Sequence, residues 1–158
     1  MINNVEMLNY IRQNVEMGIH GITHILDRVS DDKLKTALED QRREYGKIYG
    51  AADKAIRQLG HQPVHVDKMA KIGSDMSTVF KTMADGSDSK IAEMMIQGNT
   101  MGAIKIMRKL GSFDGGSRDI HNLANKLLDT EQSNIDQMKR YLWFMIIQTM
   151  FIHTLYLT

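Results

Sequence analysis

The sequence predicts an all-α protein, an up-and-down bundle of four long helices with one additional helix and an apolar C-terminal extension. Apolar residues recur three and four positions apart in five segments, which is the spacing of amphipathic helices. No segment shows the alternation of apolar and polar residues that is typical of half-buried strands. The 158 residues include a single proline, so long helices meet few breaks. Short joints between the segments favour one helical bundle.

The first two segments predict a helical hairpin. Residues 5–29 place apolar side chains on one face over about six turns. Ser30-Asp31-Asp32 then offers a cap and early negative charge for a second helix over residues 34–59, which Gly60 ends. Because the joint is short, we expect the two helices to run in opposite directions.

Three further helices are expected along the rest of the chain. Residues 69–83 carry the apolar spacing of a third helix. Ser87 or Ser89 can cap a fourth, which runs to Leu110 and is apolar on more than one side. A glycine-rich turn over residues 112–116 separates it from the fifth helix.

The composition changes after Leu142, so we expect a bundle domain over residues 1–142 and an extension over residues 143–158. The extension carries no Asp, Glu, Lys or Arg. A helix of its length would span about 24 Å at about 1.5 Å per residue, which is short for a bilayer crossing. Three interpretations remain: an interface helix that continues the fifth helix, a membrane anchor, and an appendage that is not native to the domain.

Composition excludes several classes of site. The formal net charge is +1 and no basic block is present, so nucleic-acid binding is not expected. The chain has no cysteine, which excludes disulfides, thiolate metal sites and cysteine nucleophiles. It also lacks phosphate-binding glycine loops and nucleophile elbows. The first residues do not have the pattern of a secretory signal, which makes the cytoplasm the expected compartment.

Methionine is unusually frequent, with thirteen residues in the chain. Methionine is common in pliable cores and at helix interfaces. We therefore expect a homo-oligomer, a dimer or higher, that assembles through methionine-rich helix faces and the C-terminal extension. Attachment to a membrane is the rival use of that extension.

Four polar residues fall within the apolar stripes of the predicted helices. They are Gln41 in the second helix, Asn99 in the fourth, and Glu131 and Asn134 in the fifth. At about 100° per residue, Glu131 and Asn134 lie within roughly 60° of the centre of their stripe. A buried carboxylate needs a partner, so we expect the four groups to form a buried polar centre.

The layout of residues 5–142 resembles the ferritin-like superfamily, and in particular its small bacterial bundles. In that superfamily, two antiparallel helix pairs hold two iron ions with lone glutamates and Glu-x-x-His motifs. Here Glu131-Gln-Ser-Asn134 and Glu44-Tyr-Gly-Lys47 match the motif with the histidine replaced, and Glu16 and Glu93 are the nearest matches to the lone glutamates. The resemblance implies iron or manganese held by Glu16, Glu44, Glu93 and Glu131.

The replacement of both motif histidines argues against a bound metal. Amide nitrogen is a poor metal ligand and a lysine ammonium repels a cation. We therefore expect a degenerate polar centre without a cofactor, in a non-catalytic binding or structural protein. An iron- or manganese-binding carboxylate bundle and a membrane-tethered helical scaffold are the alternatives.

The first helix offers one other metal site. Glu16, His20 and His24 stand four residues apart, and two histidines so placed can chelate a metal with a carboxylate as third ligand. This row lies about 160° from the apolar stripe, so it is expected to face water.

Overall fold

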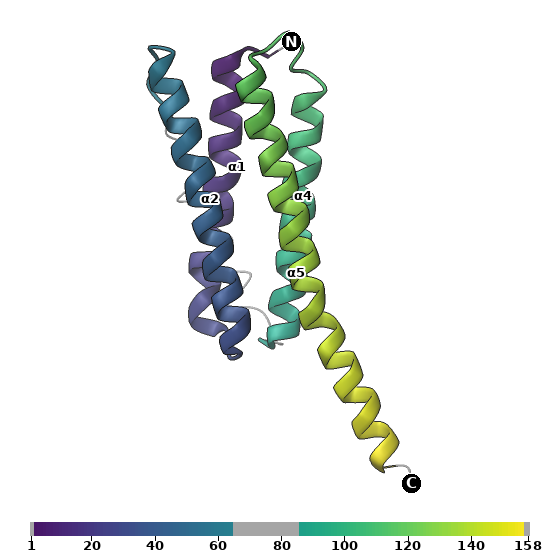
Figure 1. Ribbon diagram of the computed structural model, residues 1–158. Coiled ribbons are helices and arrows are strands. Elements are labelled where there is room, and N and C mark those ends of the chain that lie inside the picture. Colours follow the sequence, from purple (N-terminus) through teal and green to yellow (C-terminus); the bar gives the residue numbers. More distant parts are fainter. Residues whose placement is uncertain (1, 65–85, 157–158) are drawn as a thin grey trace.

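The computed structural model describes residues 2–64 and 86–156, with side chains up to residue 142. Within these ranges every regular element is a helix (Figure 1): α1 (Asn4–Ile25), the 3-10 helix η1 (Leu26–Arg28), α2 (Asp32–Gln58), α4 (Asp88–Leu110) and α5 (Arg118–Tyr156). The all-α prediction is confirmed for this part of the chain. The helix expected over residues 69–83 lies outside the described residues.

The helix ends follow the capping chemistry of the sequence. Asn3 and Glu6 form a capping box at the start of α1, and the side chains of Asp31 and Ser87 accept from the first turns of α2 and α4. α2 ends at Gln58, where Gly60 adopts a φ of 78°. A left-handed residue at this position is typical of a helix C-terminus and favours glycine. The first helix is shorter than expected because its last turn tightens into η1.

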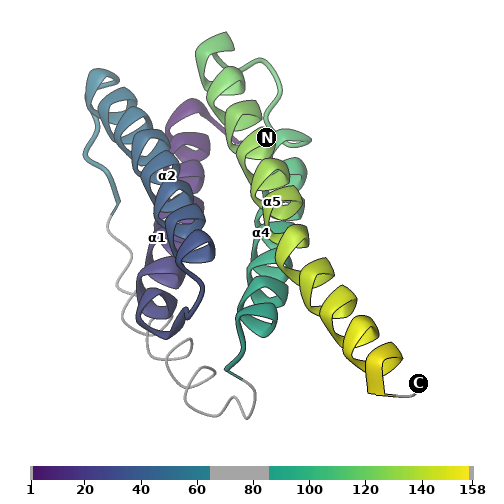
Figure 2. The same cartoon turned by 60° about the horizontal axis from the view of Figure 1, so that its bottom comes forward.

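The helices pair as two hairpins, α1 with α2 and α4 with α5 (Figures 1 and 2). Contacts at the helix ends fix their directions. The backbone N–H groups of Ser30 and Asp31 donate to the carboxylate of Asp88, so α2 and α4 begin at the same end of the bundle. Ile2 donates to the carbonyl oxygen of Ser112, so α1 begins where α4 ends. Directions therefore alternate within each hairpin, while α2 and α4 run the same way.

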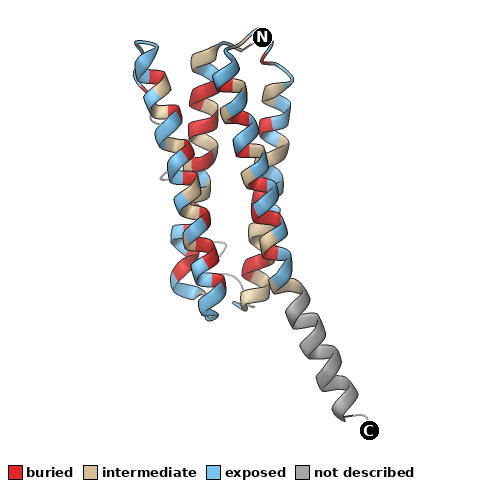
Figure 3. Ribbon diagram, viewed as in Figure 1, coloured by how far each residue is buried: buried red, intermediate tan, exposed pale blue. Residues whose placement is uncertain are grey.

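The core lies between the four long helices, on the faces that the apolar spacing predicted (Figure 3). Ile11, Leu38 and Ile106 are among its fully buried residues, from α1, α2 and α4. α5 contributes Ala124, Leu127 and Met138. Burial of these apolar surfaces is the main term that holds the two hairpins together.

α5 continues without a break beyond Leu142 to Tyr156 and projects past the ends of the other helices (Figures 1 and 2). The backbone thus joins the predicted extension to the fifth helix. Whether residue 142 is a domain boundary stays a prediction. In the part of the chain that the structure describes, no helix is long and apolar enough to cross a membrane.

Candidate functional site: a buried polar centre beside a small cavity

Four buried side chains from three helices meet at the hydroxyl group of Tyr45, which lies on α2. The Tyr45 oxygen lies 2.6 Å from Oδ1 of Asn99 on α4. It also lies 2.8 Å from Oε2 of Glu131 and 3.1 Å from Nδ2 of Asn134, both on α5. Nδ2 of Asn134 donates to Oδ1 of Asn99 at 3.4 Å as well. This polar centre therefore ties α2 to both helices of the other hairpin.

Two glycines make room for the polar centre. A Cβ atom at Gly18 would lie 2.6 Å from Cε2 of the Tyr45 ring, so only glycine lets that ring pack against α1. A Cβ atom at Gly102 would lie 2.7 Å from Oε1 of Glu131. Glu131 and Asn134 are three residues apart and therefore share one face of α5. Close helix approach at the glycines thus places the four polar groups in one layer.

The protonation of Glu131 decides how the hydrogen bonds at Tyr45 are arranged. The hydroxyl group of Tyr45 has one proton, but Asn99 Oδ1 and Glu131 Oε2 both lie within hydrogen-bond distance of its oxygen. Asn99 Nδ2 donates to the carbonyl oxygen of Met95 at 2.7 Å, which leaves Oδ1 facing Tyr45. Tyr45 can donate to Asn99 or to an ionised Glu131. When Glu131 is protonated, its own O–H can donate to Tyr45 while Tyr45 donates to Asn99, so that both short contacts hold a proton.

Burial favours the uncharged forms of Glu131 and Tyr45. It raises the pKa of Glu131 to about 7, and the hydrogen bond with Tyr45 opposes that rise only in part. Burial also raises the pKa of Tyr45 well above its ordinary value, and the nearby carboxyl group of Glu131 adds to this shift. In mildly acidic solution the centre is thus an uncharged hydrogen-bonded network.

Tyr45→Phe is expected to lower the free energy of unfolding by about 2 kcal/mol, because it removes the hydrogen bonds of the hydroxyl group and leaves Oε2 of Glu131 without its partner. Urea denaturation followed by circular dichroism measures this loss. Tyr10→Phe is the matched control, since the Tyr10 side chain is only half-buried and lies outside the centre. Equal stability of the two variants would show that the Tyr45 hydroxyl group has no structural role.

A cavity of about 200 Å³ lies next to the polar centre, between α1 and α4. Tyr45, Asn99 and Glu131 contribute to its wall. The rest of its lining is mostly methionine and glycine, with Asn14 and Lys105 as the other polar members. The centre is therefore not sealed inside the core but borders a space that a small molecule can enter.

The structure separates the residues that the ferritin-like resemblance implied as metal ligands. Glu44 pairs with Lys47 and Glu93 pairs with Lys90, on partly exposed faces of α2 and α4. Glu16 has a buried oxygen, Oε2, that lacks a hydrogen-bond partner among the described residues. Among the side chains of residues 2–64 and 86–142, no three His, Asp or Glu groups converge as a metal site would require. The residues present do not fit a shared di-iron centre.

Gln41, expected at the centre, lies elsewhere. It is buried as predicted, but its Nε2 donates to Oε1 of Gln137 at 2.6 Å and it shares no hydrogen bond with Asn99, Glu131 or Asn134 among the described residues. Three of the four expected residues therefore come together. Tyr45, the fourth member, was missed because a tyrosine in an apolar stripe reads as a packing residue. The signal that could have found it is the polar tip that a buried tyrosine must satisfy.

The histidine row on α1 does not form a metal cluster with Glu16 in the described structure. Nδ1 of His24 lies 2.7 Å from the carbonyl oxygen of His20, one turn earlier in α1. The two rings lie 6.4 Å apart between centroids. This contact takes up one nitrogen of His24 within the helix.

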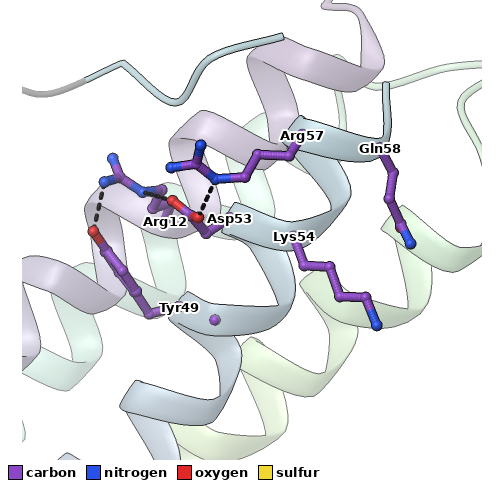
Figure 4. A pocket seen from close by; sticks show the side chains of 7 residues that line it. Arg12, Tyr49, Asp53, Lys54, Arg57 and Gln58 are labelled. Carbon is purple, nitrogen blue, oxygen red and sulfur yellow. Dashed lines mark hydrogen bonds and ion pairs between the residues drawn. The ribbon is translucent and has the colours of Figure 1, made fainter. Parts of the chain in front are cut away.

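A second polar cluster, also missed from sequence, surrounds Arg12 (Figure 4). The Arg12 side chain is 1% exposed. Its guanidinium group donates to Asp53 Oδ1 at 3.2 Å, to the carbonyl oxygen of Val64 at 2.9 Å and to the hydroxyl group of Tyr49, and it lies over the Tyr49 ring. Arg57 donates to the other oxygen of Asp53 at 2.9 Å. The Arg12 cluster thus joins α1 to α2 and to the segment that follows α2.

A shallow groove of about 660 Å³ borders the Arg12 cluster. Hydrogen bonding to Arg57, together with the charges of Arg57 and Arg12, lowers the pKa of Asp53, so the cluster contains a firmly ionised carboxylate. Arg12 is engaged in contacts within the protein on three sides. These contacts indicate a structural role, in which Arg12 acts as a clamp between α1, α2 and the segment after α2.

Comparison with known proteins finds a similar fold but no matching family. No family model matches the chain, and no curated protein matches it. Among solved structures, the chain is similar to a DUF305 fragment from Deinococcus radiodurans, with a TM-score of 0.71 and 13% sequence identity. The similarity covers 90% of this chain and 96% of that chain. At this level of identity it shows a shared helical fold alone.

Proposed function

We propose that this protein is a ferritin-like bundle with a degenerate, metal-free centre, and that it acts by binding rather than by catalysis. One observation carries the proposal: the hydroxyl group of Tyr45 lies among Asn99, Glu131 and Asn134 and hydrogen-bonds to all three. Ferritin-like bundles place their inward glutamates at such a central layer to hold metal. Here a hydroxyl group takes the role of the metal as the shared partner.

The helix directions support the ferritin-like part of the proposal. α2 and α4 begin at the same end of the bundle, so the four long helices do not simply alternate. Ferritin-like folds join their two hairpins by one long crossover and have this parallel pair. The Glu131-Gln-Ser-Asn134 motif lies on α5 with both its end residues buried, as the Glu-x-x-His motif would.

The chemistry of the centre supports binding rather than catalysis. A catalytic acid or nucleophile needs a partner in the substrate, whereas the polar atoms at the Tyr45 hydroxyl group are engaged with one another. Buried hydrogen-bonded networks hold helices in one register. The open side of the polar centre is the methionine-lined cavity, which suits a ligand that is held and released unchanged.

Elemental analysis of protein purified without a tag tests the metal-free centre. We expect iron and manganese far below one ion per chain, and no change on Glu131→Ala. Near-stoichiometric iron or manganese that disappears in Glu131→Ala would instead establish the carboxylate-bundle alternative. Asp136→Ala is the matched control, because its carboxylate lies on the surface of α5 with Lys139 and is not one of the implied ligands, so its loss should not alter metal content in either case.

We also propose that the chain assembles as a homo-oligomer. Exposed methionines support this: Met17, Met101 and Met107 are 36%, 55% and 52% exposed, respectively. The projecting end of α5 gives a second surface, because its sequence after Leu142 carries no charged residue.

Stopping the chain after Leu142 is expected to lower the assembly state while the bundle stays folded. Light scattering coupled to size exclusion measures the mass, and circular dichroism checks the helix content. Loss of the fold on truncation would contradict this, since residues 143–158 would then belong to the core. Cell fractionation of the full and shortened chains tests the membrane alternative, in which only the full chain would sediment with membranes.

A further inference from the structure

The cavity beside the polar centre has walls of a distinct kind. Met94 and Met95 on α4 and Met17 on α1 give it apolar, adaptable surfaces. Gly98 and Gly21 widen it because they have no side chain. Met101 and Lys105 are exposed and also line the cavity, so they mark the side on which it opens to solvent. The space is therefore apolar, accessible and bounded by side chains that can move to fit a ligand.

One polar atom of the cavity wall, Oε1 of Glu131, is not used by the hydrogen bonds of the polar centre. Glu131 is 2% exposed, and its Oε2 is bonded to Tyr45. Its Oε1 makes no hydrogen bond among the described residues, and it lies where only glycine at position 102 leaves space. Oε1 is not among the fully buried atoms that lack a hydrogen bond, and Glu131 lines the cavity, so this oxygen is accessible from the cavity and can accept from a ligand that brings a donor.

The volume of the cavity limits the size of the ligand. An apolar cavity of about 150 Å³ is enough to hold benzene, and the present cavity is about 200 Å³. One six-membered ring, or an aliphatic body of similar volume, with a single polar substituent fills such a space. A larger ligand would extend past Met101 and Lys105 into solvent.

The groups that line the cavity also limit the charge of the ligand. The Lys105 ammonium group lines the cavity and disfavours a cation, and removing an ionised group from water into a mostly apolar space disfavours any charged ligand. Oε1 can only accept a hydrogen bond from the ligand. The complementary molecule is therefore uncharged and carries an O–H or N–H donor at one end.

We propose that this cavity binds a small uncharged molecule with an apolar body and one hydrogen-bond donor, which donates to Oε1 of Glu131 while its body packs against the methionines of α1 and α4. This inference rests on the proposed metal-free centre and names the class of ligand that the centre receives.

Phenol and toluene, which differ by a hydroxyl group in place of a methyl group, are the probes for a titration by calorimetry with the full chain. We expect phenol to bind about tenfold more tightly than toluene, the factor that one net hydrogen bond contributes. Glu131→Gln keeps an acceptor oxygen and should keep the preference. Glu131→Met should abolish it. Absence of saturable phenol binding to the folded wild-type protein, or equal affinity for the two probes, would overturn the proposal.

A pair of glycine variants tests the location without altering Glu131. Gly102→Ala places a methyl group 2.7 Å from Oε1 of Glu131 and should abolish phenol binding, whereas Gly98→Ala lines the same cavity, meets no atom within 4 Å and should retain it. Phenol binding to a folded Gly102→Ala protein equal to that of wild type would overturn the site. Metal analysis on the same samples separates the two proposals: metal-free protein that ignores phenol contradicts only the ligand, while metal-loaded protein contradicts the centre itself.

Discussion

Replacing Arg12 with methionine is expected to lower the free energy of unfolding by about 3 kcal/mol, near the lower end of the range for breaking a buried ion pair. The change removes three hydrogen bonds, to Asp53, Tyr49 and the carbonyl oxygen of Val64. Methionine restores much of the buried aliphatic volume, so the loss reports the guanidinium group rather than a cavity. Asp53 keeps Arg57 as a partner, and this moderates the effect.

Arg57→Met is the matched control for Arg12. Arg57 pairs with the same carboxylate, but its side chain is 54% exposed. An exposed ion pair contributes about 0–1 kcal/mol, so this variant should unfold close to wild type in urea. If both variants lost the same small amount of stability, Arg12 would not be the clamp between α1, α2 and the segment after α2.

The sequence predicted the helices well because their determinants are local. Apolar spacing, cap residues and glycines decide where α1, α2, α4 and α5 lie, and each acts within a few residues. Asp31 and Ser87 cap as expected, and Gly60 ends α2. The direction of α2 relative to α4 was less accessible, because it depends on contacts between distant residues such as Asp31 and Asp88.

The polar centre was accessible only in part. A single helix projection shows that Glu131 and Asn134 face inward, and both are buried. It does not show which layer of the bundle a side chain reaches. Gln41 thus faces inward but bonds to Gln137, while Tyr45, one turn further along α2, reaches the centre. Long side chains and the axial offset between helices decide these pairings, and neither is readable from one sequence.

Arg12 shows a second limit of sequence reasoning. A charged residue beside an apolar stripe is usually solvated, because its long side chain can carry the charge to water. Here the partners are supplied by Asp53, 41 residues away, and by the backbone of Val64, 52 residues away. Only the tertiary structure brings them together, so burial of the charge could not be anticipated.

The pH dependence of stability follows from Glu131. Its pKa is about 7 in the folded protein and about 4.3 in an unfolded chain. The folded protein thus binds the proton more tightly, and the stability it gains is fully present below about pH 4.3 and is lost as the pH rises through about 7. Two other titratable groups line the same cavity, Tyr45 on α2 and Lys105 on α4. Asn14, which lines it from α1, does not titrate.

Glu131→Gln provides the matched variant, because glutamine mimics a neutral carboxyl group at every pH. Its amide can donate to Tyr45 as the protonated acid does. All other titrating groups are common to both proteins, so their contributions cancel in the difference between the two free energies of unfolding. That difference isolates the titration of residue 131.

The most direct test of a hydrogen-bonded centre is therefore urea denaturation of wild type and Glu131→Gln from pH 5 to pH 8. We predict that the stability of the glutamine variant relative to wild type rises by roughly 2–3 kcal/mol over this range. A difference that stays constant, with the glutamine variant less stable throughout, would contradict the account. It would show an ionised carboxylate at position 131, as a metal-bound centre requires.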